Sequence, residues 1–466
     1  MIQSIRFDRF LPAALVSALL VAAAPEAVAQ KLVIEAGRIV QDASTEITDG
    51  IIVVEGGRIV AIGRQGEVEK PWDAPVVGGP EFVAFPGFVE AHSNRGMDRP
   101  NENIDVAPFL DVRDSIDPIN LYFEDCRRWG MTTVNIQQGN NCVVGAQGRI
   151  VRPVGLTIEE MTVRPGYGLK LSAAAKSGKS AATQAQALRT AFEDLRRYLE
   201  GIVQDAKDGG DKARREAMFQ GRDLTGEKAT GRAMGGNTWK VEGLELIPRG
   251  AIDEKQAPLL DLVEGRGTAF IWCGSPRDVH LALEIARTHG FLDRTTLVLD
   301  PSCWKAADVV AESGVAVVLE APLVHIERDP LTGEETETFV PGVFAQKGVR
   351  FALSSQNSSS NSLWFQAARA IGLGLDRKTA IDAVTRVPAE ILGLGDQVGT
   401  LAVGRLANVL LLSGDPLAND AWVQHAIIEG EMVYDRAKDV RNKYLIDGIE
   451  PMGVEGALDA SRAGAR

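Results

Sequence analysis

The sequence lacks an excess of positive charge and has few cysteines. Its 466 residues carry a formal net charge of -13, which excludes the basic surface that nucleic-acid-binding proteins use. The four cysteines show no zinc-knuckle spacing. An even number permits two disulfides in an oxidising compartment, but a chain of this length buries a large core without them. We therefore expect Cys126 and Cys142 to be reduced, buried thiols.

Long apolar runs are also absent, except near the N-terminus. Residues 11–24 are almost wholly apolar, Arg6 and Arg9 precede them, and the small residues Ala27-Val28-Ala29 follow. This order predicts a signal peptide over residues 1–29, cleaved after Ala29. An uncleaved anchor is the alternative, but the run is shorter than the ~20 residues of a spanning helix. We expect an exported protein, periplasmic or secreted, with no membrane span after signal removal.

The two ends of the mature chain share a strand pattern that differs from the middle. Residues 31–84 and 400–435 alternate apolar and polar residues in short runs, which indicates antiparallel strands. Between them, strands and helices alternate as in parallel units. The predicted strands are 268–273, 296–299, 315–319 and 349–353, and the predicted helices are 279–289 and 306–313. Residues 170–240 depart from this rhythm, with a helix over 182–203 and a polar, glycine-rich insertion over 209–236.

Several motifs carry a family resemblance over nearly the whole mature chain. Residues 85–94 read FPGFVEAHSN, so that a strand leads into Pro-Gly and then into acid-Ala-His. Further motifs lie at 50–63 (GIIVVEGGRIVAIG), 130–134 (GMTTV), 141–148 (NCVVGAQG), 388–394 (PAEILGL), 399–408 (GTLAVGRLAN) and 411–417 (LLSGDPL). Together they resemble the imidazolonepropionase-like members of the amidohydrolase superfamily.

The resemblance implies a fold and an activity. The expected fold is an α/β (β/α)8 TIM-like barrel over residues 86–395, with an insertion around 170–240. A small β-sandwich is expected from both chain ends, 30–85 and 396–440, followed by a tail over 441–466. The implied activity is zinc-dependent hydrolysis of C-N bonds in non-peptide amides or dipeptide-like substrates.

The implied ligand set is only partly matched. The family places two histidines after its first strand, one after each of two middle strands, and an aspartate after the last. His92 matches the first histidine, whereas Asn94 and Gln356 occupy the second histidine and the aspartate positions. No histidine lies in 272–278 or 300–305. Lys170 matches a lysine that carries a bridging carbamate in relatives, but we interpret it as a solvated or salt-bridged lysine near the barrel mouth. We therefore expect no metal cofactor, zinc being implied by the family alone.

Other residues remain as candidates. Asn94, Gln356 and Asn357 are neutral hydrogen-bonding groups suited to orienting a polar ligand. Cys273 and Cys303 are predicted to end neighbouring strands, and either thiolate would be a nucleophile if its pKa were lowered. His325, beyond a strand end, is the one further histidine retained as a candidate.

Two functions follow from these observations. The first is a non-metal relative that binds a small polar ligand or supports a partner, either another copy of itself or a paralogous amidohydrolase. The alternative is an active hydrolase of C-N bonds with an atypical site.

Overall fold

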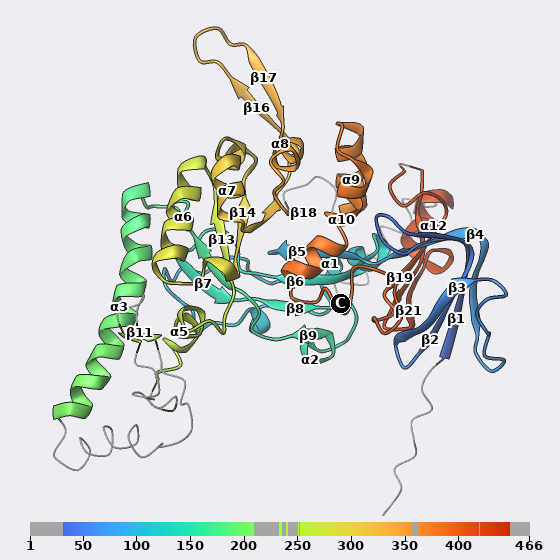
Figure 1. Cartoon of the computed structure of the whole chain (residues 1–466), viewed down its shortest axis with the longest axis horizontal. Coiled ribbons are helices and arrows are strands. Elements are labelled where there is room, and N and C mark those ends of the chain that lie inside the picture. The colour runs from blue at the N-terminus through green and yellow to red at the C-terminus, as the bar shows by residue number, and fades with distance from the viewer. Residues whose placement is uncertain are drawn as a thin grey trace, which may run out of the picture.

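A seven-stranded sheet combines strands from residues 31–86 with strands from residues 409–435 (Figure 1). The computed structural model describes residues 31–208, 233–234, 239–240, 250, 252–356, 362–418 and 420–447. The sheet order is β21-β20-β19-β4-β1-β2-β3. The strands are β1 (Lys31–Val40), β2 (Glu46–Glu55), β3 (Arg58–Arg64), β4 (Val76–Pro86), β19 (Val409–Leu412), β20 (Val423–Ile428) and β21 (Glu431–Asp435).

The pairing within this sheet differs in one place from the all-antiparallel prediction. β4 pairs antiparallel with β19, which brings Pro86 opposite Val409, but it pairs parallel with β1. The reason is the chain path: β2 and β3 extend the sheet from one edge of β1, so the chain must cross back to place β4 on the other edge. Alternation predicts a strand but does not predict its partner.

Two further sheets form the middle of the chain. One has the order β18-β15-β14-β13-β10-β7, and the other has the order β5-β6-β8-β9. Neighbours from β10 to β18 are parallel, as are β5 and β6. The strands are β5 (Phe88–Ser93), β6 (Met131–Ile136), β7 (Val144–Gln147), β8 (Arg149–Val151), β9 (Thr162–Arg164), β10 (Leu169–Ser172), β13 (Ala269–Cys273), β14 (Thr295–Leu299), β15 (Ala316–Leu319) and β18 (Phe351–Leu353).

Helices cover the parallel strands, as in other mixed α/β folds. α6 is typical: Pro276 opens it at the first turn, and it buries Val279, Leu283 and Ala286 against the strands. The helices are α1 (Leu121–Arg128), α2 (Ile158–Met161), α3 (Ala181–Asp208), α5 (Ala257–Val263), α6 (Pro276–Thr288), α7 (Ala307–Ser313), α8 (Val340–Gln346), α9 (Leu363–Gly372), α10 (Arg377–Asp382), α11 (Arg386–Ile391) and α12 (Val440–Asp447). Short 3-10 helices are η1 (Val112–Asp114), η3 (Leu292–Arg294), η4 (Pro301–Ala306) and η5 (Arg436–Lys438).

The two middle sheets share one apolar interior. Val89 of β5 and Ile150 of β8 belong to the same buried cluster as Phe270, Val298 and Val318 of the parallel sheet. Backbone hydrogen bonds between the described strands do not close these two sheets into a ring. Contacts between side chains and backbone instead join β5 to the segment after β18, as described below. The C-terminal ends of β5, β10, β15 and β18 meet in one region, where His92, Lys170, Glu320 and Ser355 make their contacts.

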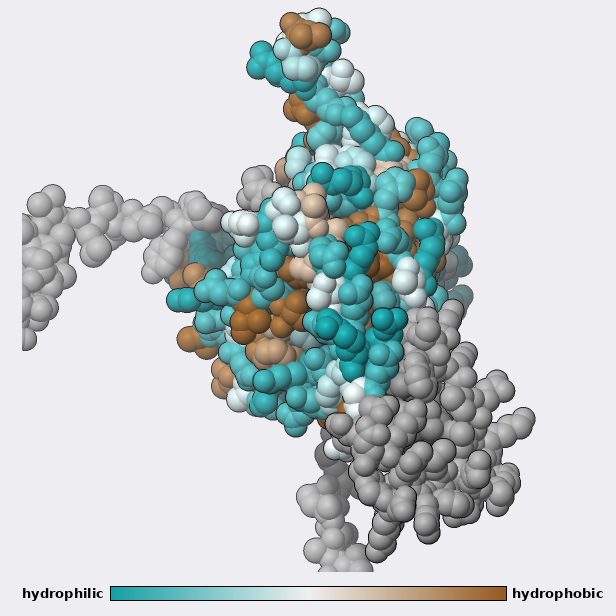
Figure 2. Space-filling model, turned by 90° about the vertical axis from the view of Figure 1, so that its left-hand side faces the viewer, coloured by the Kyte–Doolittle hydropathy of each residue, from teal (hydrophilic) through white to brown (hydrophobic). Residues whose placement is uncertain are grey.

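A two-stranded hairpin stands apart from the sheets. β16 (Val324–Arg328) and β17 (Glu335–Phe339) pair with each other and rise clear of the rest of the chain (Figure 1). The same hairpin forms the top of Figure 2, with hydrophobic surface at its tip, and Leu331 in its turn is 94% exposed. A second pair, β11 (Ala233–Met234) and β12 (Trp239–Lys240), lies within the predicted insertion.

Two of the segments predicted from sequence fall on residues that the structure does not describe. The signal segment and most of the glycine-rich stretch at 209–236 lie outside the described residues. Among the residues that are described, no helix is both long and apolar enough to cross a membrane.

Candidate functional site

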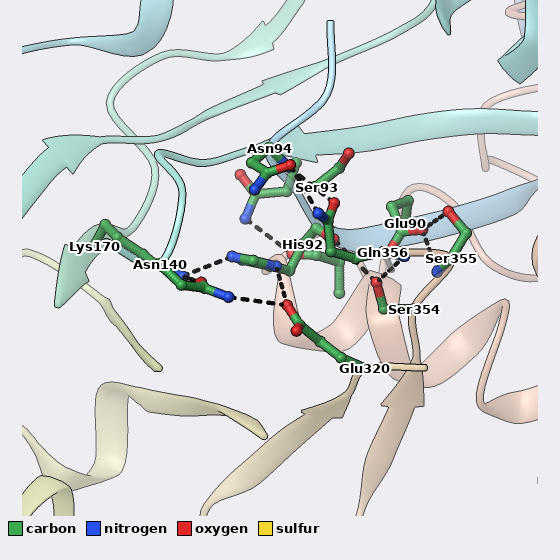
Figure 3. Close-up of polar contacts among 12 residues, drawn as sticks. Glu90, His92, Ser93, Asn94, Asn140, Lys170, Glu320, Ser354, Ser355 and Gln356 are labelled. Carbon is green, nitrogen blue, oxygen red and sulfur yellow. Dashed lines mark hydrogen bonds and ion pairs between the residues drawn. The ribbon is translucent and has the colours of Figure 1, made fainter. Parts of the chain in front are cut away.

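The site begins at β5, which carries Glu90 and His92 in a wholly buried strand. Regular alternation places residues two apart on the same face of a sheet, but the β5–β6 register shifts between Glu90 and Ser93. Glu90 contacts Ser355 after β18, whereas His92 contacts Lys170 on β10 (Figure 3). The irregularity therefore directs the two side chains toward different partners.

Lys170 lies at the centre of the site. Its Nζ is 2.8 Å from His92 Nε2 and donates a 2.7 Å hydrogen bond to Asn140 Oδ1 (Figure 3). An ammonium group donates but cannot accept, so Nε2 of His92 is the acceptor and the imidazole proton resides on Nδ1. The lone pair with which Nε2 could bind a metal is thus directed at an ammonium.

We expected Lys170 to be solvated or salt-bridged near the barrel mouth, and the first of these alternatives is wrong. The side chain is fully buried, because Leu169 and Leu171 face the helices and their alternation turns Lys170 to the interior. Burial lowers the pKa of Lys170 to about 8. Burial also lowers the pKa of His92 well below its ordinary value, and the nearby Lys170 ammonium lowers it further.

Glu320 is a site residue that the sequence analysis missed. It follows β15, is buried, and places Oε1 3.6 Å from His92 Nδ1 and 3.5 Å from Asn140 Nδ2. Burial raises its pKa to about 7, although Lys170 opposes that shift. An acid directly after a predicted buried strand was the available signal, because strand C-terminal ends are where barrel sites form.

Asn94 and Gln356, both predicted to bind ligand, are bonded to each other. Gln356 Nε2 donates to Asn94 Oδ1 at 2.8 Å, and the Asn94 backbone N–H donates to Gln356 Oε1 at 3.3 Å (Figure 3). This pair ties the end of β5 to the segment after β18. Asn357 lies outside the described residues.

Two serines reinforce the same junction. Ser355 donates to Glu90 Oε2 from its backbone N–H at 2.9 Å and from its hydroxyl at 2.6 Å, and Ser354 Oγ donates to the His92 carbonyl at 3.2 Å. Burial raises the pKa of Glu90 to about 6, while the Ser355 hydrogen bonds oppose the rise. These contacts hold β5 of one sheet against the segment after β18 of the other, although the two sheets share no backbone ladder among the described strands.

The cysteine candidates lie near one another but not in this network. Cys303 Sγ donates to the Cys273 carbonyl at 3.3 Å, and both thiols are free. They pack in the apolar cluster with α6 and α7, because Trp272 rather than Cys273 shares the face of Lys170 on the neighbouring strand. Burial raises the pKa of both thiols, which disfavours the nucleophilic thiolate.

The remaining cysteine and histidine predictions have clear outcomes. Cys126 and Cys142 are free and buried, as predicted. His325 lies half-buried on β16 of the projecting hairpin, where it pairs with Thr338 rather than with a site residue.

The donor chemistry around His92 does not fit a zinc site. Zinc sites use several imidazole, thiolate or carboxylate ligands, and an ammonium cannot be a ligand. Across the part of the chain that the structure describes, no group of three or more His, Cys, Asp or Glu side chains is placed to hold a metal ion. A divalent ion at Nε2 would have to displace Lys170.

A family model and several solved structures are similar to this chain. Residues 269–433 match the model of the amidohydrolase family. The chain therefore resembles the amidohydrolase family over 165 of its 466 residues. Its fold is similar to that of an amidohydrolase from Thermotoga maritima MSB8, with a TM-score of 0.69 and 22% identity over 87% of this chain and 100% of that one. A search of curated protein sequences gave no match.

Two further solved structures align with this chain at lower TM-scores. An adenosine deaminase from Xanthomonas campestris with bound zinc has a TM-score of 0.46 and 15% identity, over 90% of this chain and 97% of that one. A Xaa-Pro dipeptidase with methionine bound in its active site has a TM-score of 0.43 and 14% identity, over 87% and 100%. The candidate site is the network of His92, Lys170, Glu320 and the Asn94–Gln356 pair.

Proposed function

We propose that this amidohydrolase-superfamily chain binds a small polar ligand at the mouth of a (β/α)8 barrel and does not use a metal-bound hydroxide. The observation that supports this is the 2.8 Å contact between Lys170 Nζ and His92 Nε2. An ammonium about 4 Å from a divalent ion, at an effective dielectric constant of about 20, opposes binding by roughly 8 kcal/mol. The proposal takes the sheet from both chain ends as the β-sandwich of the superfamily.

The groups at the strand ends suit a small polar ligand that carries an amide or a carboxylate. Asn94 and Asn140 are half-buried, so each retains a surface that a ligand can reach. Their amides both donate and accept, which allows them to orient an amide or a carboxylate without reacting with it. Dipeptides and N-acyl amino acids combine these groups and are the first ligands to test.

A second function is favoured by one observation. Glu320, with a pKa of about 7, and Lys170, with a pKa of about 8, lie on either side of His92. Groups that exchange protons near neutral pH suit general acid–base catalysis. The second candidate is therefore hydrolysis of a C-N bond that uses these side chains without a metal.

The deciding experiment measures metal content, hydrolysis and binding on one preparation. Elemental analysis of the purified chain is combined with a hydrolysis screen on dipeptides and N-acyl amino acids, and with thermal-shift titrations of the same compounds. Lys170→Met is the test variant, and Lys347→Met, an exposed lysine paired with Asp308 on the outer helices, is the control.

Each outcome points to one function. Ligand binding without hydrolysis or stoichiometric metal, weakened in Lys170→Met but not in Lys347→Met, supports the proposal. Hydrolysis that resists chelator and is lost in Glu320→Gln supports the second function. About one metal ion per chain, with hydrolysis that chelator abolishes and zinc restores, contradicts both.

We also propose that the chain is exported and that it pairs with another copy of itself or with a paralogous amidohydrolase. The order of Arg6, the apolar run and Ala29 supports a mature chain that begins at Gln30 in the periplasm or outside the cell. N-terminal sequencing of the exported protein tests this, and a chain that still begins at Met1 would contradict it. Light scattering, alone and with a co-expressed paralogous amidohydrolase, tests the proposed partner role.

A further inference from the structure

A second cavity lies at the opposite end of the parallel strands. It has a volume of about 810 Å³ and is lined by residues at the starts of β13, β14, β15 and β18, including Thr268, Thr295, Ala316 and Arg350. Parallel strands all begin at one end of a sheet and finish at the other. The cavity is therefore separate from the His92 site, which lies where these strands end.

Three arginines line this cavity: Arg287, Arg294 and Arg350. Its two carboxylates already have partners. Asp293 binds Arg294 at 2.9 and 3.0 Å, and Glu390 accepts a 2.7 Å hydrogen bond from Arg386. The lining thus carries a positive excess within a protein whose net charge is -13.

Two of the three guanidinium groups, those of Arg287 and Arg350, donate no hydrogen bond to a described residue. Arg287 makes no ion pair with any described residue, and the nearest carboxylate oxygen to Arg350 is 3.7 Å away. The Nε of Arg294 is buried, and among the described residues it has no hydrogen-bond partner. The other nitrogens of Arg294 already donate to Asp293 and to the Leu262 and Gly290 carbonyls, so the free donors that line the cavity belong to Arg287 and Arg350.

We propose that this cavity binds a small organic anion with two or more negative oxygens, such as a phosphate ester or a di- or tricarboxylate. Guanidinium groups bind both oxyanions through paired N–H donors, and the volume lies in the range of small-molecule sites. The binding site is additional to the proposed function and does not depend on it.

The test uses the full chain with inorganic phosphate and citrate as probes, measured by calorimetry and thermal shift at matched ionic strength. Arg287→Gln and Arg350→Gln are the test variants, since both side chains are exposed and their loss leaves the core intact. Arg189→Gln, an exposed arginine that pairs with Glu284 on α6, is the control. Lys170→Met separates this cavity from the His92 site.

Each test variant is expected to weaken binding of one or both probes about tenfold, the effect of one charge-assisted hydrogen bond pair. Arg189→Gln and Lys170→Met should bind as the wild type does. Tighter binding of phosphate would indicate a phosphate ester as the ligand, and tighter binding of citrate would indicate a di- or tricarboxylate. The inference would be overturned if neither probe bound, or if Arg287→Gln and Arg350→Gln bound the probes as tightly as the wild type. It would also be overturned if Arg189→Gln weakened binding as much as the test variants do.

Discussion

Replacing Glu320 by glutamine should change how stability depends on pH. Burial raises the pKa of Glu320 from 4.5 to about 7, so between these values the folded chain holds a proton that the unfolded chain has released. Stability from this group is complete below pH 4.5 and is lost as pH rises toward 7. A shift of this size corresponds to about 3 kcal/mol, since each pKa unit is worth about 1.4 kcal/mol.

Urea unfolding followed by circular dichroism across that pH window measures the effect. Wild type should lose about 3 kcal/mol more stability than Glu320→Gln as pH rises through the window. Glu337→Gln, an exposed residue on β17, controls for the general effect of removing a carboxylate and should follow wild type. Parallel curves for wild type and Glu320→Gln would refute the reasoning, because they would mean that Glu320 titrates alike in both states.

Two further predictions follow from the site and one from the buried cysteines. Because burial lowers the pKa of Lys170 from 10.5 to about 8, stability should rise by about 3 kcal/mol as pH increases through that window, and Lys170→Met should abolish the rise in the same urea assay. Asn94→Leu should cost about 1–3 kcal/mol by leaving the Gln356 amide without its acceptor, and a double variant with Gln356→Leu should cost less than the sum of the two single variants. Iodoacetamide should label the four buried cysteines slowly in native protein and rapidly in urea; native labelling at the rate of a free thiol would contradict the described burial.

The α/β class and the strand–helix order of the middle region could be predicted from sequence because they depend on short-range patterns. The predicted strand 296–299 corresponds to β14, the predicted helix 306–313 to α7 and the helix 182–203 to α3. Each is a continuous apolar or periodic run that needs no partner to be recognised. The parallel pairing of β1 with β4 could not be predicted in this way, because a partner is set by the path of the connection between strands.

The site was less predictable because its contacts join residues far apart in the chain. A family pattern located His92 and Asn94, but no local pattern indicates that Lys170 lies against His92 or that Gln356 bonds Asn94. The burial of Lys170 could have been predicted from strand alternation, because it lies between Leu169 and Leu171. Glu320 could have been predicted as a site residue because it is an acid directly after β15. In both cases the local pattern predicts where a side chain points, whereas a family motif specifies only which residue type stands at a position.

Restoring one imidazole should not create a zinc site. In Asn94→His, a second histidine would stand beside the first, but Lys170 would still direct its ammonium at His92 Nε2. The Oε1 of Gln356, at the position of the family's aspartate, also already accepts a hydrogen bond from the Asn94 backbone N–H. Elemental analysis of Asn94→His is therefore expected to show no stoichiometric zinc. Adding Lys170→Met should raise zinc affinity, because it removes a positive charge and frees Nε2 while Glu320 remains nearby. One zinc ion per chain in Asn94→His alone would show that Lys170 yields to a metal, and the central argument for metal-free binding would fail.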